Sequence, residues 1–328
     1  MQPLKSFTLA LLASCFQFLD IAYAATPSSG CGRQIPGNIN LTASTNVSII
    51  SGGFNRSYLF HLPKAYDIDT PAPLIFSYHG RTRSAEQQEG LSQFSNSSYN
   101  KDAIAVYPQG SQWSKNRRVR QWQGDPVADP EVDDIKFTLD MIDAIKSDFC
   151  IDTSRIYAAG KSNGGGLVNL LACDPRSAPV FAAYAPVSGA FYLNKNKSEP
   201  RCNPGVPLIP MMEFHGTGDE TISYDGNNND SDSRGPTFNI PTWLAEWKER
   251  DDCDRKNTTK TLCGEGTDSP EVTRYEWTCR GEKDALVHYR IDGWGHDWPS
   301  TFANNDTKKT ICFDATRVIM KWFGTKSL

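Results

Sequence analysis

The sequence predicts an α/β fold in which helices cover both faces of a mostly parallel central sheet. Short apolar runs typical of buried strands alternate with amphipathic stretches typical of helices along most of the chain. Residues 160–164 read Gly-x-Ser-x-Gly between one strand-like run and one helix-like run. A carboxylate loop and then a histidine loop follow, each directly after a further strand-like run, as a catalytic α/β domain requires.

Composition sets the class of protein. The chain has 328 residues, of which 38% are hydrophobic and 22% charged, so it is long enough for a large core. Its net charge is -4 and it has no basic stripe, which argues against a nucleic-acid partner. We expect a monomer without a membrane span.

The first 24 residues predict a signal peptide. Lys5 supplies the positive end, residues 7–18 are apolar, and Ala22-Tyr23-Ala24 is a cleavage site. We therefore expect a secreted protein in which residues 25–328 form a single domain.

Cysteines and glycosylation sequons agree with secretion. Cys15 leaves with the signal peptide, and the remaining eight cysteines predict four disulfides whose pairing the sequence leaves open. Each sequon predicts an exposed asparagine in a glycoprotein. The sequons begin at Asn40, Asn46, Asn55, Asn96, Asn196, Asn229, Asn257 and Asn305.

The first part of the chain predicts an N-terminal arm, an antiparallel edge and a central strand. The arm covers residues 25–40 and is pinned by Cys31. Residues 46–51 and 56–62 alternate in polarity, which is typical of an antiparallel pair, whereas residues 73–78 are continuously apolar.

A His-Gly pair follows this central strand. We interpret His79 as a side chain that hydrogen-bonds the loop backbone. The backbone amide of Arg81 or Thr82 is expected to form part of an oxyanion hole.

A helix is expected over residues 84–95 and a buried strand over residues 103–107. The long loop of residues 108–130 then carries Trp122, which either lines a binding cleft or packs within the loop. Asp129 before a proline predicts the start of the next helix, in which Asp133 and Asp134 stabilise the helix dipole.

Ser162 is the predicted nucleophile. The turn between the strand of residues 155–159 and the following helix needs glycine on both sides, because side chains there would clash with the strand or the helix. The amide of Asn163, at the helix N-terminus, points at the developing oxyanion. A glycine-rich turn without catalytic function is the alternative.

The strands of residues 180–187 and 207–214 come next, and Ser188 is interpreted as a strand-end turn. Asp219, in a glycine-rich loop after the second of these strands, is the predicted triad acid, with Glu220 or Asp225 as alternatives.

The remaining segments close the domain. Residues 240–250 predict a helix, and residues 251–285 predict a surface excursion stapled by disulfides. Residues 286–291 predict the last strand, with His288 exposed on one face, and residues 315–323 predict a final helix.

His296 is the predicted general base, because it lies in a loop after the last strand and follows the acid. The order Ser162, Asp219, His296 is the order of the α/β-hydrolase fold. Trp294 and Trp298 flank His296 and are expected either to stack on a substrate ring or to shape the loop.

Several motifs together resemble fungal feruloyl esterases, which are similar to the polyhydroxybutyrate depolymerase-like branch of carbohydrate esterase family one. The resemblance extends from about Cys31 to Phe323, apart from residues 225–240 and 255–285. It rests on His79-Gly80, Trp122, Asp133-Asp134, residues 160–166, Ser188-Gly189, Asp219 and residues 293–299.

The resemblance implies a secreted serine esterase, without metal or cofactor, that hydrolyses feruloyl esters of plant cell-wall polysaccharides such as arabinoxylan. An acetylxylan esterase and a polyester depolymerase share the same frame and remain alternatives. An inactive hydrolase-fold binding protein is the alternative from another class.

Overall fold

A mixed β-sheet forms the centre of the molecule. The computed structural model describes residues 24–112, 119–194, 196–198, 200–227, 235–264 and 269–328. Within these ranges the sheet has ten strands in the order β1-β2-β4-β3-β5-β6-β7-β10-β9-β8. The strands are β1 (Thr45–Ser51), β2 (Phe54–His61), β3 (Ala72–Tyr78), β4 (Ile104–Pro108), β5 (Ile151–Lys161), β6 (Ala183–Val187), β7 (Met211–Gly216), β8 (Thr258–Cys263), β9 (Val272–Cys279) and β10 (Glu282–Ile291).

The six adjacent strands β4, β3, β5, β6, β7 and β10 run parallel to one another. Antiparallel strands extend the sheet at both edges, β2 and β1 beside β4 and β9 and β8 beside β10. The predicted antiparallel pair of residues 46–51 and 56–62 is confirmed as β1 and β2. The carboxyl ends of the parallel strands therefore meet at one edge, where loops from β3, β5, β7 and β10 can form a common site.

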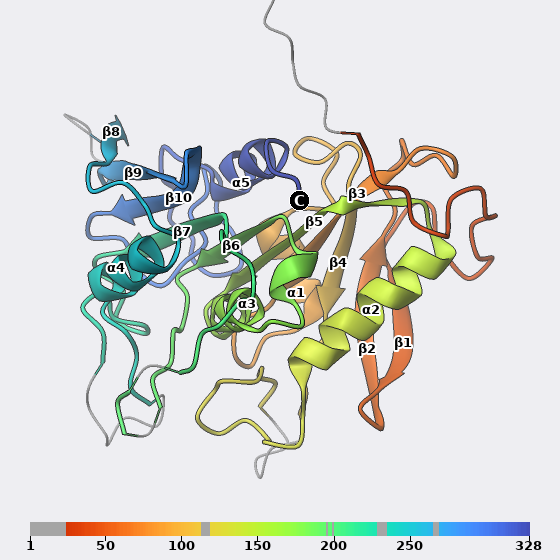
Figure 1. Ribbon diagram of the computed structural model, residues 1–328, viewed down its shortest axis with the longest axis horizontal. Coiled ribbons are helices and arrows are strands. Elements are labelled where there is room, and N and C mark those ends of the chain that lie inside the picture. Colours follow the sequence, from red (N-terminus) through yellow and green to blue (C-terminus); the bar gives the residue numbers. More distant parts are fainter. Residues whose placement is uncertain (1–23, 113–118, 195, 199, 228–234, 265–268) are drawn as a thin grey trace, which may run out of the picture.

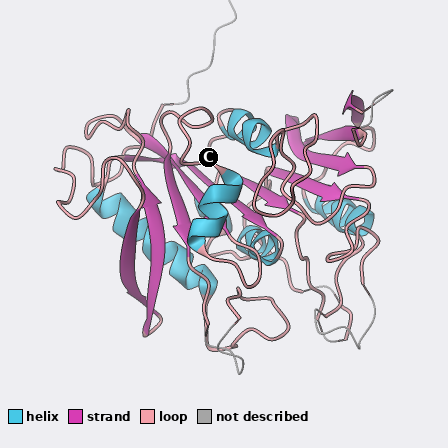
Figure 2. Cartoon of the chain, turned by 180° about the vertical axis from the view of Figure 1, so that it is seen from behind, coloured by secondary structure: helices cyan, strands magenta, loops and turns pink. Residues whose placement is uncertain are grey.

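Helices cover both faces of the sheet (Figures 1 and 2). On β3, Leu74 and Phe76 belong to the core under α2, α3 and α4, whereas Ile75 belongs to the core under α1 and α5. Successive side chains of a strand point to opposite faces of the sheet. Because helices cover both faces, this strand needs apolar side chains on both of its faces. The helices are α1 (Ala85–Ser92), α2 (Asp134–Asp148), α3 (Asn163–Cys173), α4 (Ile240–Arg250) and α5 (Ala315–Phe323).

Helix α2 begins four residues later than the sequence predicts, since the predicted N-cap is Asp129. Its N-cap is Asp133, whose side chain accepts a hydrogen bond from the amide of Lys136. Asp134 is buried and forms a 2.7 Å ion pair with Arg56 of β2. Asp133 thus serves the helix N-terminus as predicted, whereas the prediction that Asp134 only stabilises the helix dipole is wrong; Asp129 lies before the helix.

The segment of residues 251–285 is more regular than predicted. It contains β8 and β9, which pair antiparallel with each other and extend the sheet beyond β10. The disulfides expected in this segment are present and join Cys253 to Cys279 and Cys263 to Cys312. His288 on β10 is only 2% exposed, so the prediction of an exposed histidine is wrong.

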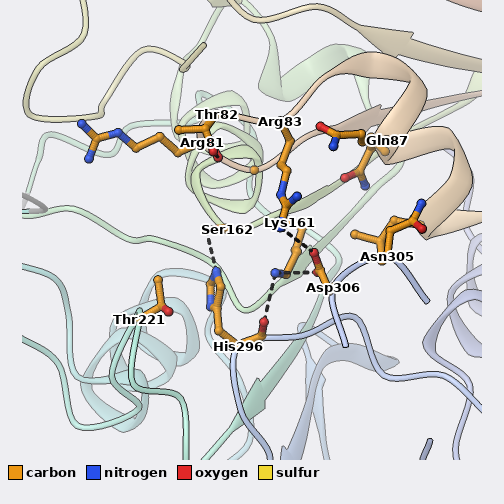
Figure 3. Close-up of a pocket in the computed structure, with 13 residues that line it drawn as sticks. Arg81, Thr82, Arg83, Gln87, Lys161, Ser162, Thr221, His296, Asn305 and Asp306 are labelled. Carbon is orange, nitrogen blue, oxygen red and sulfur yellow. Dashed lines mark hydrogen bonds and ion pairs between the residues drawn. The ribbon is translucent and has the colours of Figure 1, made fainter. Parts of the chain in front are cut away.

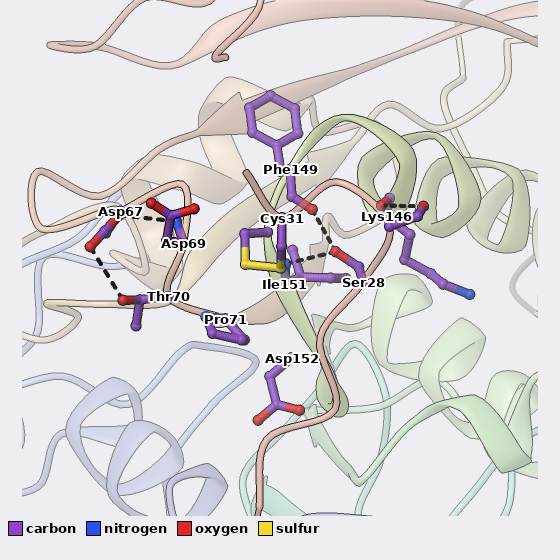
Figure 4. The surroundings of a disulfide bond; sticks show 12 residues. Ser28, Cys31, Asp67, Asp69, Thr70, Pro71, Lys146, Phe149, Ile151 and Asp152 are labelled. Carbon is purple, nitrogen blue, oxygen red and sulfur yellow. Dashed lines mark hydrogen bonds between the residues drawn. A yellow bond between two sulfur atoms is a disulfide. The ribbon is translucent and has the colours of Figure 1, made fainter. Parts of the chain in front are cut away.

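Of the other two disulfides, one ties the N-terminal arm to the core and one starts from the last residue of α3. Cys31 pairs with Cys150 immediately before β5, and Cys173 pairs with Cys202. Beside the first bridge, the Ser28 hydroxyl donates to the carbonyl oxygen of Phe149 at 2.6 Å (Figure 4). The predicted N-terminal arm is thus held against the start of β5, and all eight cysteines of the described chain are paired as the sequence predicts.

The sequon asparagines in the described ranges lie at the surface. Six are exposed and Asn96 is half-buried, while Asn229 lies outside the described residues. The predicted signal peptide also lies outside the described residues, apart from Ala24. No helix in the described ranges is long and apolar enough to cross a membrane.

Candidate active site

Ser162 lies in a sharp turn between β5 and α3. Its φ of 78° and ψ of −114° place it in a positive-φ conformation that residues with a side chain rarely adopt. A Cβ on Gly160 would lie 2.6 Å from the backbone of Gly164, and a Cβ on Gly164 would lie 2.2 Å from the carbonyl oxygen of Tyr78. The turn therefore has no room for other residues at these two positions, as the sequence predicts.

The structure brings Ser162, His296 and Asp219 together in one hydrogen-bonded chain. His296 Nε2 is 2.8 Å from the Ser162 hydroxyl oxygen (Figure 3), and His296 Nδ1 is 2.7 Å from Asp219 Oδ2. The other carboxylate oxygen of Asp219 accepts the amides of Thr221 and Ile222, each at 2.8 Å. This geometry suits a serine nucleophile, a histidine base and an orienting carboxylate.

The environment keeps the acid charged and the base neutral. Burial favours the protonated form of Asp219, but hydrogen bonds from His215 and His296 outweigh it and lower the pKa of Asp219. Burial, followed by the charge of Lys161, holds the pKa of His296 below its ordinary value of 6.5, although Asp219 opposes the shift. A neutral imidazole next to a hydroxyl can accept its proton.

The alternative acids lie elsewhere. Glu220 and Asp225 have exposed side chains, whereas Asp219 is 4% exposed. The geometry thus favours Asp219 over both alternatives that the sequence left open.

The two sides of the predicted oxyanion hole differ. The amide of Asn163 belongs to the first turn of α3, where amides have no partner within the helix. The amide of Thr82 already donates to the carbonyl oxygen of Arg120 at 2.8 Å, so its predicted role is wrong. The amide of Arg81 has no hydrogen-bond partner in the described part of the chain, and it stays the candidate on this side.

The tryptophans do not contact the cleft. Trp122 is fully buried and holds the site from behind, since its amide donates to Asn163 Oδ1 at 2.8 Å and its indole donates to the carbonyl oxygen of His79 at 2.7 Å. Trp298 is fully buried against Phe94, and Trp294 is 5% exposed within the same core. The prediction that these three residues bind substrate is wrong, because each packs in the interior.

His79 also plays the structural role that the sequence predicts. Its Nδ1 lies 2.7 Å from the carbonyl oxygen of Gly80, and its Nε2 accepts the amide of Gly110 at 2.9 Å. Ser188 lies in a turn at the end of β6 with a φ of 46°, as expected.

A cleft with a volume of about 340 Å³ opens beside Ser162 and His296. Figure 3 shows Lys161 and Asp306 on one wall, joined by a 2.6 Å ion pair, and Lys161 Nζ also donates to the carbonyl oxygen of His296 at 3.1 Å. No aromatic side chain of the described residues lines this cleft. Its lining consists of Gly80, Arg81, Thr82, Arg83, Gln87, Gln88, Leu91, Lys161, Ser162, Thr221, His296, Asn305 and Asp306.

Sequence reasoning missed the polar groups that support the triad. Glu213 and His215 are fully buried behind Asp219, and Lys161 lies on the cleft side of His296. One signal was available: residues 213 and 215 stand two apart in a strand, so their side chains share a face. Lys161 gave no comparable signal, because its partners come from distant loops.

No group of three or more histidine, cysteine or acidic side chains suited to a metal ion occurs among the described residues. The expectation that no cofactor is needed stays a prediction.

Comparison with known proteins identifies a family that part of this chain matches. Residues 56–198 match the family described as esterase PHB depolymerase. The chain carries a domain of this family. The matched segment of this PHB depolymerase-type domain includes Ser162 but ends before Asp219 and His296.

Curated relatives extend the similarity beyond that segment. Feruloyl esterase B of Piromyces equi is 33% identical over 247 residues, which are 74% of this chain and 42% of that protein. Feruloyl esterase D of Neurospora crassa is 29% identical over 67% of this chain and 70% of that protein. A bifunctional acetylxylan esterase/xylanase of Neocallimastix patriciarum is 24% identical over 69% of this chain and 29% of that protein. The chain thus spans less than half the length of two of these relatives.

Solved structures confirm the predicted α/β-hydrolase fold. An acetyl xylan esterase from Aspergillus awamori has a TM-score of 0.53 at 17% identity, covering 85% of this chain and 99% of that chain. Thermogutta terrifontis esterase 2 has a TM-score of 0.52 at 14% identity, covering 87% of this chain and 95% of that chain. At these identities the likeness concerns the fold alone.

Proposed function

We propose that this protein is a serine esterase that hydrolyses feruloyl and related hydroxycinnamoyl esters of plant cell-wall polysaccharides such as arabinoxylan. The observation that carries the proposal is the hydrogen-bonded chain from Ser162 through His296 to Asp219 in a nucleophile elbow. A dead hydrolase fold with a binding role would have no need to keep a strained serine aligned with a buried base.

The reaction follows from this geometry. His296 Nε2 accepts the proton of Ser162 as the hydroxyl oxygen attacks the ester carbonyl, and Asp219 stabilises the resulting imidazolium. The amides of Asn163 and Arg81 bind the oxyanion. His296 then gives this proton to the sugar oxygen as the ester C–O bond breaks, and the alcohol leaves. A water molecule, deprotonated by His296, attacks the acyl-enzyme, and His296 returns the proton to the Ser162 oxygen as the acid leaves.

The substrate class rests on the relatives and on the chemistry of the cleft. Two of the similar proteins are named feruloyl esterases. The cleft wall carries Arg83 and Gln87, which can hydrogen-bond to hydroxyl groups of a sugar or a phenol.

One observation favours a second candidate, an acetylxylan esterase. The described lining of the cleft has no aromatic ring on which a feruloyl group would stack, and an acetyl group needs none.

We further propose that the protein is secreted as a monomeric glycoprotein and that residues 25–328 form one esterase domain. Four disulfides in the described chain support an oxidising compartment. Intact-mass analysis of the protein secreted by a fungal host tests cleavage after Ala24 and glycan attachment.

The test of the activity compares initial hydrolysis rates on methyl ferulate and on a short-chain acetate ester, with the Ser162→Ala variant as control. We expect hydrolysis of ferulate to fall by about 10⁴- to 10⁶-fold in the variant while its thermal transition stays nearly unchanged. Acetate hydrolysis without ferulate hydrolysis would select the second candidate. Wild-type protein inactive on both esters, or a variant with appreciable turnover, would contradict the proposal.

A further inference from the structure

A chain of buried polar side chains extends behind the triad acid. Glu213 and His215 project from β7 and are fully buried, and His288 on β10 is 2% exposed. The proposed catalytic mechanism uses none of these groups, and polar side chains are seldom buried this deeply without a specific arrangement of partners.

Both ring nitrogens of His215 face acceptors. Nδ1 lies 3.0 Å from Glu213 Oε1, and Nε2 lies 2.8 Å from the carbonyl oxygen of Ile222 and 3.4 Å from Asp219 Oδ2. A carbonyl oxygen and an ionised carboxylate accept hydrogen bonds but cannot donate them. Burial opposes the ionised form of Glu213, but hydrogen bonds from His215 and His288 outweigh it and lower the pKa of this carboxyl. With Glu213 ionised, both nitrogens of His215 carry a proton, which makes His215 a cation.

At the other end of this row of polar side chains, the hydrogen bonds require no second cation. Glu213 Oε2 accepts from His288 Nδ1 at 2.6 Å, and His288 Nε2 lies 3.0 Å from the hydroxyl of Tyr224, which can donate to it. A neutral His288 thus fulfils both contacts. Two buried carboxylates, Glu213 and Asp219, then flank one imidazolium, and this arrangement offsets their cost of burial.

We propose that His215 is a permanently charged positioning residue that fixes the orientation of Asp219 and weakens the pull of that carboxylate on His296. The inference rests on the proposed esterase function of the triad. It assigns His215 no contact with substrate, since its ring has no exposed surface.

The charges around His215 support this role. Hydrogen bonds to Asp219 and Glu213 outweigh the effect of burial and raise the pKa of His215 to about 10. The remaining neighbours, His288 and Tyr224, bear on it only through Glu213 or by ring contact. His215 is therefore expected to keep its charge over the whole range in which an esterase of this type is assayed.

The charges around His296 fix the direction of the effect. Asp219 stabilises the imidazolium form of His296, whereas the cations Lys161 and His215 destabilise it. Removing the charge of His215 therefore raises the pKa of His296. The base then becomes protonated, and inactive, at a higher pH than in the wild-type protein.

Two further carboxyl groups lie near the same loop. Asp306 pairs with Lys161, and burial together with Asp306 raises the pKa of Asp297 to about 7. Both side chains are present in every variant used below.

The first test reads the charge directly and does not depend on activity. Nitrogen-15 NMR of the histidine-labelled Ser162→Ala protein, with the His215 signals assigned by their loss in Ser162→Ala/His215→Gln, is recorded from pH 5 to pH 8. We expect two protonated ring nitrogens for His215 throughout. One unprotonated nitrogen at pH 7 would overturn the proposal whatever the protein hydrolyses.

The second test measures the pH profile of kcat/KM on p-nitrophenyl acetate and methyl ferulate. For His215→Gln we expect the acid-side midpoint to rise by about 0.5 to 1 pH unit, which is about three- to tenfold less activity well below both midpoints. His288→Gln is the control, because it touches the same Glu213 but not Asp219. Its midpoint should stay at the wild-type value.

The outcomes separate this inference from the proposed function. A rise confined to His215→Gln supports the inference, while a lower melting temperature with an unmoved midpoint would make His215 merely structural. If hydrolysis does not depend on Ser162, the proposed function fails, although the NMR result still reports on the charge of His215.

Discussion

Ser162 follows β5 and Asp219 follows β7, and the two residues are held in different ways. Around Ser162 the constraint lies in the backbone: a strained positive φ, and flanking glycines with no space for a Cβ. Around Asp219 the constraint lies in side chains, because His296 and His215 share one carboxylate oxygen and buried Glu213 supports His215.

The two kinds of constraint differ in how many substitutions they tolerate. A backbone constraint of this kind leaves almost no choice of residue at the glycines. A network of charges can be retuned by single substitutions that keep the fold, and each change alters the basicity of His296. We therefore expect substitutions on the Asp219 side to move rates and pH profiles, and substitutions on the Ser162 side to remove either activity or stability.

The largest effect that we expect on the Asp219 side comes from Asp219→Asn. An amide at this position favours the wrong tautomer of His296 and no longer stabilises its cation, so kcat should fall by about 10⁴-fold. Steady-state hydrolysis of methyl ferulate near pH 7 measures it, and Glu220→Gln, on an exposed side chain, is the control. A variant with a near-wild-type rate would return the role to Glu220 or Asp225.

The corresponding test on the Ser162 side is Gly164→Ala. The new methyl group would lie 2.2 Å from the carbonyl oxygen of Tyr78, which is backbone and cannot move aside cheaply. We expect the free energy of unfolding to fall by about 3 kcal/mol or more. Denaturant unfolding measures it against Gly37→Ala, where the methyl group meets nothing within 4 Å. Equal stability of the two variants would refute the steric argument.

The same contrast explains what the sequence could predict. The elbow was predictable because a local pattern of glycines is required by local backbone geometry. Asp219 and His296 were predictable from their order along the chain and from their places after strands. Trp122, Trp294 and Trp298 were misassigned because a tryptophan in a loop reads the same whether its ring points outward or into the core.

Contacts between distant segments account for the rest. Asp134 is buried in the first turn of α2 because it pairs with Arg56 from β2, a partner 78 positions away. The prediction for Thr82 is wrong because its amide donates to the carbonyl oxygen of Arg120, which lies in the loop after β4. A linear pattern contains no information on such pairings until the strands that bring them together have been placed.

The smallest effect that we expect lies at the boundary between the two sides. Lys161 ends β5 directly before the nucleophile, yet its Nζ contacts the carbonyl oxygen of His296 and its charge helps to lower the pKa of that residue. In Lys161→Gln the amide can still donate a hydrogen bond, but the charge is gone. The pKa of His296 should then rise towards 6.5, and the acid-side midpoint of kcat/KM should move up by about 0.3 to 0.5 pH unit.

The matched control is Lys136→Gln, which removes the same charge from an exposed ion pair with Asp140 on α2. Surface charges of that kind are screened by water and salt, so its profile should coincide with that of the wild-type protein. If the acid-side midpoint moves equally in both variants, net charge rather than the local contact governs the pKa of His296. If the midpoint moves only in Lys161→Gln, and in the direction predicted for His215→Gln, two cations that do not contact the His296 ring, Lys161 and His215, both lower its pKa.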